Sequence, residues 1–472
     1  MGNPFHVVVD LAVIAILLLG IWQFRTPQGA RLGNLTAALS LLCAAGVVFY
    51  RHPTVEPWLL VAGAFLVGGF IGWLVAMRVT MIQIPAMVAF QHGAGGIAAV
   101  LVSSVELTRS AESLPAIGEF AGLLGVVIGG ATFSGSMIAS GKLANVLRQT
   151  PTVLPRHFIL LLLNLLGVLA LCVLATQASG RLRANSLLGL VMMSVLLGII
   201  FSIRIGGADM PVLISFLNAT AGLAAAFCGI IIQNRLLIAC GATVAASGSI
   251  LTHVMCRAMN RSLLNLLLGI RRASPPPNIG PAKKPSAMPV ETAARQDRDA
   301  EQSPLRRAVE AARAAQKVIL IPGYGMALAH AQLETVQLAN KLRRMGKDVK
   351  FAIHPIAGRM PGHMHVLLAE ANVDSDLLFD MDEINSEFSQ TDLVLIVGAC
   401  DVVNPAAINV PDTPIAGMPI LAAHEAKHVV VCNLDARPGY SGVGNPLYTE
   451  PKTVLMFGDA KATLSQLTEA LG

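Results

Sequence analysis

Charged residues are scarce in this sequence. Only 13% of the 472 residues are Asp, Glu, Lys or Arg, against roughly 25% in soluble domains. Aromatic residues make up 5%, so the apolar 54% is mainly aliphatic. The seven cysteines contain no C-x-x-C pair, which argues against both a disulfide framework and a cysteine metal site. This composition excludes a disordered chain, a disulfide-stapled scaffold and an ordinary single soluble domain.

The few charges divide the chain into three segments. Residues 1–270 carry a net charge of +8, residues 271–317 carry +5 and residues 318–472 carry −7. The overall +6 is therefore an average over unlike segments, and we expect no nucleic-acid partner. The Pro-rich stretches within 271–317 are typical of an extended linker.

The first segment contains nine apolar runs, each long enough for a helix to cross roughly 30 Å of hydrocarbon. They are residues 5–21, 32–49, 58–77, 84–105, 120–140, 158–176, 187–205, 211–232 and 236–259. Small residues recur in several runs, as in 125–131, and allow close helix packing in a compact bundle. Loop cations such as Lys142, and above all Arg257, Arg261, Arg271 and Arg272, place the C-terminal half in the cytoplasm.

From residue 318 the pattern alternates short strands with helices. We expect strands at 318–322, 349–354, 377–379, 393–397, 428–432 and 453–457, with helices at 326–345, 361–371 and 460–471. A further amphipathic helix is expected within 299–316. Such alternation predicts an α/β doubly wound parallel sheet of Rossmann-like type, which binds ligands at the carboxyl ends of its strands.

The turn Gly323-Tyr324-Gly325 follows the first of these strands and opens a helix. A dinucleotide fold places a pyrophosphate there, on free backbone N–H groups at the helix N-terminus. The fingerprint is incomplete, because Leu328 replaces the third small residue and no acidic residue ends the second strand. A tight strand-to-helix turn is the alternative, and NAD in the ordinary pose is not supported.

Polar, Gly-rich loops follow four strands of the predicted sheet: residues 354–363, 398–405, 437–440 and 458–461. A merely structural sheet would need only turns at these positions. Because these loops share one sheet edge, we predict a ligand site there.

Ionisable residues within apolar runs are costly and therefore suggest function. His92 lies mid-run among small residues, and a histidine with a near-neutral pKa can take up and release a proton. A histidine that merely braces two helices is the alternative. Asn218 lies inside the eighth run, and Asp209 lies just before it. Taken alone, Asn218 indicates a residue that hydrogen-bonds between helices, and Asp209 indicates a residue at the membrane interface.

Several longer motifs resemble a known family. They are residues 205–212, 256–262, 322–327, 354–364, 381–385, 403–407 and 458–461. In this order and across the whole chain, they are similar to the beta subunit of the proton-translocating NAD(P) transhydrogenases. The resemblance implies a bacterial inner-membrane, multi-pass protein embedded in lipid. It also implies a transmembrane proton-translocating domain (1–270) and an NADP(H)-binding domain (318–472), with the linker 271–317 between them.

The resemblance further implies that NADP(H) binds this chain in a reversed pose, and that an alpha subunit carries the NAD(H) domain, in a probable dimer of the alpha-beta unit. Hydride then passes directly between the two cofactors, coupled to proton translocation, with no catalytic side chain and no metal. The implied proton path and coupling residues are His92, Asn218, Asp209, Arg257, Arg261 and Asp401. The implied cofactor-binding residues are Gly323, Tyr324, Gly325, Met326, Ala327, Arg359, Met360, Gly398, Ala399, Asp401, Asn404, Arg437, Gly439, Tyr440, Gly458, Asp459, Ala460 and Lys461.

One departure from the family pattern follows the fifth strand. Where relatives usually carry a Lys-Arg-Ser run that holds the 2′-phosphate of NADP, this chain has Asn433-Leu434-Asp435. An aspartate repels a phosphate and can accept a hydrogen bond from a ribose hydroxyl. We expect Arg437 to supply the missing positive charge.

Two other functions fit the composition. One is a cation channel or secondary transporter gated by a nucleotide-sensing domain, which favours a selectivity loop or broken helices in repeated halves. The sequence shows neither feature. The other is a membrane-anchored dehydrogenase, which would need only one or two spans.

Overall fold

The computed structural model describes residues 4–23, 27–51, 58–80, 83–109, 114–148, 152, 154–206, 209–259, 262–268, 303–359, 362–411, 413 and 415–472. The chain forms two compact units. One comprises Met1–Gly206 with Val212–Thr252, and the other Gly207–Pro211 with His253–Gly472. Arg261, Met360 and residues 271–302 of the predicted linker lie outside the described residues.

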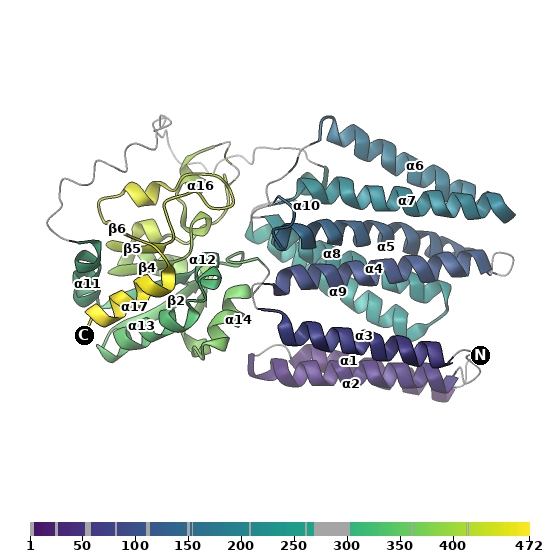
Figure 1. Ribbon diagram of the computed structural model, residues 1–472, viewed down its shortest axis with the longest axis horizontal. Coiled ribbons are helices and arrows are strands. Elements are labelled where there is room, and N and C mark those ends of the chain that lie inside the picture. The colour runs from purple at the N-terminus through teal and green to yellow at the C-terminus, as the bar shows by residue number, and fades with distance from the viewer. Residues whose placement is uncertain are drawn as a thin grey trace. The chain divides into compact units, whose positions relative to one another are not determined.

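The N-terminal part of the chain consists of long apolar helices (Figure 1). Nine helices within the described residues are long and apolar enough to cross a membrane, which confirms the predicted spans. They are α1 Pro4–Gln23, α2 Pro27–Arg51, α3 Trp58–Arg78, α4 Ile84–Arg109, α5 Ala116–Leu143, α6 His157–Gln177, α7 Gly180–Arg204, α8 Met210–Ile231 and α9 Arg235–Ala258. Each is a continuous helix, the form that satisfies its own backbone hydrogen bonds in lipid.

Glycines bring several of these helices into backbone contact. A Cβ atom added at Gly96 of α4 would lie 2.7 Å from the carbonyl oxygen of Gly129 on α5, and the reverse substitution gives the same distance. Gly222 of α8 and Gly241 of α9 approach one another similarly. Larger side chains would force these helices apart. The small residues noted in the sequence therefore set the helix spacing.

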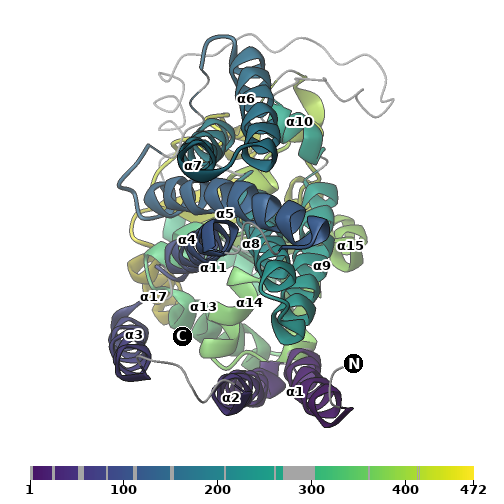
Figure 2. The same ribbon diagram turned by 90° about the vertical axis from the view of Figure 1, so that its right-hand side faces the viewer.

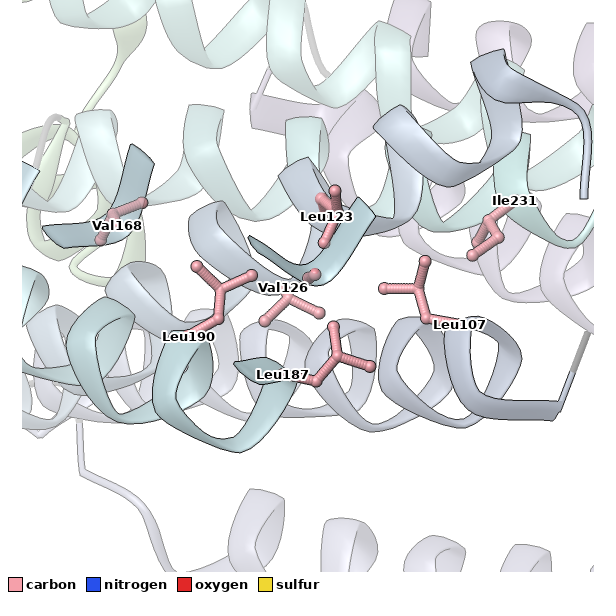
Figure 3. Packing of buried hydrophobic residues seen from close by; sticks show 8 residues of the cluster. Leu107, Leu123, Val126, Val168, Leu187, Leu190 and Ile231 are labelled. Atoms are coloured by element: carbon pink, nitrogen blue, oxygen red, sulfur yellow. The ribbon is translucent and has the colours of Figure 1, made fainter. Parts of the chain in front are cut away.

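Aliphatic side chains fill the space beside these close contacts. Figure 3 shows Leu107 of α4, Leu123 and Val126 of α5, and Leu187 and Leu190 of α7 packed together. Val168 of α6 and Ile231 of α8 complete the same cluster. Figure 2 shows α5 lying between α7 and α4. Because five helices share this cluster, their relative positions are fixed.

Lys142 has a different role from the one expected. It lies in the last turn of α5, is fully buried, and donates its ammonium hydrogens to the carbonyl oxygens of Ile203 and Ile205, each 2.6 Å away. A helix leaves its last carbonyls without intrahelical partners, and Lys142 satisfies those at the end of α7. It is a cap for a neighbouring helix rather than a cation in an exposed loop.

The C-terminal part is built on a six-stranded parallel sheet of order β3-β2-β1-β4-β5-β6. The strands are β1 Lys317–Pro322, β2 Asp348–Ile353, β3 Leu378–Asp380, β4 Leu393–Val397, β5 His428–Asn433 and β6 Thr453–Phe457. The helices are α10 Leu263–Leu268, α11 Pro304–Ala314, α12 Tyr324–Leu328, α13 Gln332–Arg344, α14 His363–Glu370, α15 Met381–Ile384, α16 Ala406–Asn409 and α17 Ala460–Ala470. This strand order is that of the dinucleotide-binding fold, whose switch point lies between β1 and β4.

One predicted helix is wrong. Residues 326–345 form two helices, α12 and α13, instead of one. His330 adopts a left-handed conformation with φ of 51°, and the N–H of Ala331 donates to the carbonyl oxygen of Met326 at 3.0 Å. This is a Schellman cap, which usually has glycine at the left-handed position. Because histidine stands there instead of glycine, no residue type marks the break between the two helices.

Candidate functional site

The turns after β1 and β4 touch each other at the switch point. The N–H groups of Gly323 and Gly325 donate to the carbonyl oxygens of Val397 and Gly398, both at 2.8 Å. A Cβ atom at Gly325 would lie 2.7 Å from the Gly398 Cα. Two of the N–H groups expected to be free for a pyrophosphate are therefore already used. The glycines here permit close contact between two turns.

Arg359 forms the centre of an aromatic cluster at this edge of the sheet. Its guanidinium carbon lies 4.3 Å from the ring centre of Tyr324 and 5.3 Å from that of Tyr440. One terminal nitrogen donates to the Tyr440 hydroxyl at 2.6 Å. The three residues come from the loops after β1, β2 and β5. Cation–π contacts of this kind stabilise a charge that is otherwise costly to bury, and Arg359 is 7% exposed.

His363 supports this cluster from the first turn of α14. Its Nδ1 accepts a hydrogen bond from the Arg359 backbone N–H at 3.2 Å, so the ring proton resides on Nε2. The Nε2 atom is buried and has no hydrogen-bond partner. Burial, and next the Arg359 charge, lower the pKa of His363, which keeps the ring neutral. Arg359 is therefore the permanent positive charge of the cluster.

Asp401 fixes the loop after β5 to the turn after β4. Its carboxylate accepts the Ser441 hydroxyl at 2.6 Å and the Ser441 N–H at 3.0 Å. A Cβ atom at Gly439 would lie 2.8 Å from both carboxylate oxygens, so only glycine allows this approach. Burial raises the pKa of Asp401, although the Ser441 hydrogen bonds oppose the shift.

Buried amide side chains hold the same loop at further points. Asn404 donates to the carbonyl oxygen of Gly444 at 3.2 Å, and Asn445 donates to that of Cys400 at 3.2 Å. Asn433 donates to the Tyr448 hydroxyl at 2.7 Å. Asn404 was predicted from its motif, whereas Ser441, Asn445 and Tyr448 were not. No sequence signal marks these residues, because their partners lie 40, 45 and 15 positions away.

At the end of β2, His354 stands where an ordinary dinucleotide fold has an acidic residue. Its Nε2 hydrogen-bonds the carbonyl oxygen of Pro419 at 2.8 Å, and its Nδ1 accepts the N–H of Ile356 at 3.3 Å. Burial lowers the pKa of His354 to about 4. Both nitrogens are occupied and the ring is neutral, so His354 is a structural brace and cannot bind a ribose.

The pH dependence of stability should reveal this histidine. The pKa falls from 6.5 in the unfolded chain to about 4 in the fold, so His354 stabilises the fold above pH 6.5 and loses this effect as pH falls toward 4. The difference corresponds to about 3 kcal/mol. In urea unfolding followed by limited proteolysis, His354→Gln should flatten the acid decline of the C-terminal unit. His365→Gln, at a histidine whose side chain is 43% exposed, is the control, and equal curves for wild type and His354→Gln would contradict the assignment.

Other predicted residues lie apart from the Arg359 cluster or have structural partners. Asp459 caps α17 by accepting the N–H of Ala462 at 3.0 Å, and Lys461 pairs with Glu334 at 3.3 Å. Gly458 has a positive φ of 140° at the same turn. Met326, Ala327, Ala399 and Ala460 are buried beside the strand ends.

Arg437 is 88% exposed and lies 3.5 Å from the Asp435 carboxylate. The Arg437 N–H also donates to that carboxylate, at 2.9 Å. The positive charge expected to replace the missing basic run is therefore present after β5, but an acidic partner accompanies it.

In the membrane-type helices the structure brings together only part of the predicted path. His92 of α4 lies within hydrogen-bonding reach of the Asn218 side chain of α8. Asp209 lies just before α8, nine residues from Asn218, which is about 13 Å of helix. Arg257 is exposed in the last turn of α9. His92 and Asn218 are thus a pair, whereas Asp209 lies before the first turn of α8 and Arg257 in the last turn of α9.

Apolar membrane-type helices that hold a histidine–asparagine pair, joined to a dinucleotide-type sheet with a buried arginine at its carboxyl edge, define a membrane protein with a dinucleotide-fold domain. Comparison with known proteins agrees. The family model described as NAD(P) transhydrogenase beta subunit matches residues 6–470. The chain belongs to this family, as the sequence motifs indicated.

Individual relatives extend this match over nearly the whole chain. The NAD(P) transhydrogenase subunit beta of Rhodospirillum rubrum is 38% identical over 464 residues, covering 97% of this chain and 97% of the relative. The protein of the same name from a named strain of that species gives the same values. The family name implies the use of NAD(H) and NADP(H), and an alpha subunit as partner.

Proposed function

We propose that this chain binds NADP(H) at the carboxyl edge of its sheet and exchanges hydride with NAD(H) held by an alpha subunit, coupled to proton translocation. Residues 318–472 are the nucleotide-binding domain and residues 1–270 the proton-translocating domain. The observation that carries the proposal is the buried Arg359 cluster at the β1–β4 switch point, where this fold binds dinucleotides.

The residues at this edge suit a dinucleotide phosphate. Arg359 supplies a permanent positive charge, and the buried Nε2–H of His363 lacks an acceptor. Buried donors are normally satisfied, so a phosphate oxygen of the cofactor is a suitable partner. The aromatic faces of Tyr324 and Tyr440 offer surfaces on which a ring can stack.

The nicotinamide rings supply the hydride chemistry when bound. This chain's residues bind and orient. Arg359 and the two tyrosines hold the charged and aromatic parts of the cofactor, and Asp401 holds Ser441 so that the loop 437–445 covers the edge. Opening of this loop requires loss of the Asp401–Ser441 hydrogen bonds. The charge on Asp401 therefore controls access to the site.

The occupied nitrogens of His354 favour a reversed cofactor pose. Because the end of β2 offers no ribose acceptor, the adenosine half lies toward β4, β5 and β6 instead. The residues after β5, Asp435 and Arg437, then read the 2′ position of the adenosine ribose. Arg437 attracts a 2′-phosphate, whereas Asp435 repels it.

Replacing Arg437 by alanine should weaken NADP binding about fivefold and leave NAD binding unchanged, because an exposed charge pair contributes up to about 1 kcal/mol. Asp435→Asn should strengthen NADP binding by a similar factor. Titration of the purified chain with both nucleotides measures the ratio. Lys427→Ala, which removes a cation paired with Asp392, is the control. An unchanged NADP-to-NAD ratio in Arg437→Ala would remove Arg437 from the site.

Proton translocation depends on His92. Its ring can take up a proton while Asn218 holds the ring in place, and the path then leads along α8 to Asp209. Beyond it lies Arg257, in the last turn of α9, which we place at the cytoplasmic end of the helices, and Arg261 follows four residues later in the sequence. The proton signal reaches the loop 437–445 through Asp401, whose ionisation the burial opposes. Coupling requires a two-state element whose equilibrium is shifted both by protonation and by nucleotide binding. In this proposal the loop 437–445 is that element.

The complete enzyme is a dimer of alpha-beta units in the lipid of a bacterial inner membrane, with the nucleotide-binding domain in the cytoplasm. The hydride step is tested with NADH labelled by deuterium at C4. Membranes that contain both subunits should form deuterated NADPH. Label that enters water, or transfer without the alpha subunit, would contradict direct transfer between two bound cofactors.

A nucleotide-gated channel or transporter is the competing function. Transporter sites of that kind are built from broken helices in repeated halves, whereas the nine spans within the described residues are continuous. Hydride transfer by the two subunits separates the two functions, because a gated channel catalyses none.

A further inference from the structure

The interface of α4, α5 and α8 carries polar side chains beyond the His92–Asn218 pair. Ser136 of α5 faces α4 beside His92, with its Cβ 3.2 Å from the position that a Cβ at Gly93 would take. Ser136 is 0% exposed, and its hydroxyl has no hydrogen-bond partner. The Nδ1 atom of His92 is also buried without a partner. Two unsatisfied polar atoms therefore lie at the same height along the helices of this interface, which we call its first level.

The next level contains two hydroxyls in contact. Thr132 of α5 donates to the Thr220 hydroxyl of α8 at 2.9 Å, and Thr220 donates to the carbonyl oxygen of Leu217 at 3.1 Å. The third helix contributes Gly96, whose added Cβ would lie 3.3 Å from the Thr132 Cβ. Because Gly96 has no side chain, α4 packs directly against α5 beside the Thr132–Thr220 pair.

A third level lies farther along the same helices. The Ser103 hydroxyl of α4 lies beside the Cys228 thiol of α8, and a Cβ at Gly125 of α5 would lie 2.6 Å from it. Positions 92, 96 and 103 are spaced by four and seven residues, so they share one face of α4. His92 and Ser103 are eleven residues apart, or about 16 Å of helix.

These three levels extend away from Asp209. Along α8, Asp209 precedes Asn218, whereas Thr220 and Cys228 follow it. His92 therefore lies between two polar stretches: one leads toward Asp209, and the other leads away from it toward Thr220 and Cys228. Buried hydroxyl and imidazole groups without partners cost about 1–3 kcal/mol each, and ordered water normally satisfies such groups.

We propose that Ser136, Thr132, Thr220 and Ser103 bind a file of water molecules that conducts protons between His92 and the Arg109 end of α4. This inference rests on the proposed function and adds the half of the path that lies opposite Asp209. Each water or hydroxyl accepts one proton and passes on another, so a proton entering at one end leaves at the other. No hydroxyl changes its own proton count.

Removing hydroxyls from this interface should slow proton uptake without weakening nucleotide binding. We expect Thr132→Val to reduce coupled proton uptake about tenfold and Ser136→Ala to reduce it severalfold, in vesicles that contain both subunits. NADP affinity should stay within a factor of two of wild type, which also reports that the chain has folded. Thr132→Ser, which keeps the hydroxyl, should restore proton uptake.

Ser134→Ala is the matched control on the same helix. Ser134 donates to the carbonyl oxygen of Val195 on α7 at 2.7 Å, so its loss removes a hydrogen bond but no part of the path. A purely structural role predicts more damage from Ser134→Ala than from Ser136→Ala, whose hydroxyl has no protein partner. The proton path predicts the reverse order for proton uptake.

Two results would overturn the inference. One is wild-type proton uptake in Thr132→Val and Ser136→Ala. The other is the structural order of effects, with no rescue by Thr132→Ser. Failure of the proposed function looks different, because the wild-type enzyme would then transfer hydride with no proton uptake at all.

Discussion

Replacing His92 by alanine should abolish proton-coupled hydride transfer while NADP still binds. His92 is a titratable side chain within a membrane span, and Asn218 on a second helix lies beside it. Loss of a group that takes up and releases protons typically slows a reaction about 10²–10⁴-fold. Proton uptake and hydride transfer in vesicles with both subunits measure the effect, and a nucleotide titration checks that the chain is intact.

His157→Ala is the control for this variant. His157 is also buried, at the start of α6, and neither of its ring nitrogens has a hydrogen-bond partner. If any buried histidine in the bundle were needed for folding alone, both variants should fail alike. Proton uptake at the wild-type rate in His92→Ala would contradict its place in the path.

Replacing Gly398 by alanine should destabilise the nucleotide site more than any other single methyl group. Gly398 has a φ of +68°, and an added Cβ would overlap the backbone nitrogen of Met326. The atoms that the added Cβ would meet belong to the backbone of Gly325 and Met326. They therefore cannot move aside as the end of a flexible side chain can. We expect a loss of more than about 3 kcal/mol of stability and no measurable NADP binding.

Two glycines separate the causes of this effect. Gly442 also has a positive φ, of 71°, but has no atom within 4 Å of an added Cβ. Gly442→Ala therefore measures backbone strain alone, about 1–2 kcal/mol. Gly444 has neither constraint, and Gly444→Ala should be near neutral. NADP binding by Gly398→Ala within a factor of two of wild type would contradict the contact between the two turns.

The spans and strands could be predicted from the sequence because each is marked by its own residues. The strands β4 and β6 were predicted at their observed bounds, since short apolar runs between polar loops leave little choice. The spans were located for the same reason, as a helix in lipid needs about 20 apolar residues in succession.

Features that depend on distant partners could not be predicted. Ser441 gains its role only because the fold brings it to Asp401, 40 residues away. The Lys142 cap depends on the end of α7, and the use of two Gly-turn N–H groups depends on the turn after β4. The local sequence indicates where a strand ends and where a glycine stands, but it does not indicate which distant segment packs against that glycine.

The position of His354 shows how the two kinds of information combine. The sequence revealed that the usual acidic residue was missing after β2, and the structure shows the replacement with both ring nitrogens occupied. An unusual residue at a strand end can thus be recognised in the sequence, whereas its hydrogen-bond partners can be identified only in the structure. The proposed reversed cofactor pose rests on their combination.

Simultaneous recording of hydride transfer and proton movement tests the coupling most directly. The preparation is inverted membrane vesicles that contain this chain and an alpha subunit, supplied with NADPH and an NAD⁺ analogue. We predict that protons enter the vesicles as hydride is transferred, and that the reaction from NADH to an NADP⁺ analogue moves protons the opposite way. Hydride transfer at the same rate with no proton movement in either direction would contradict the account.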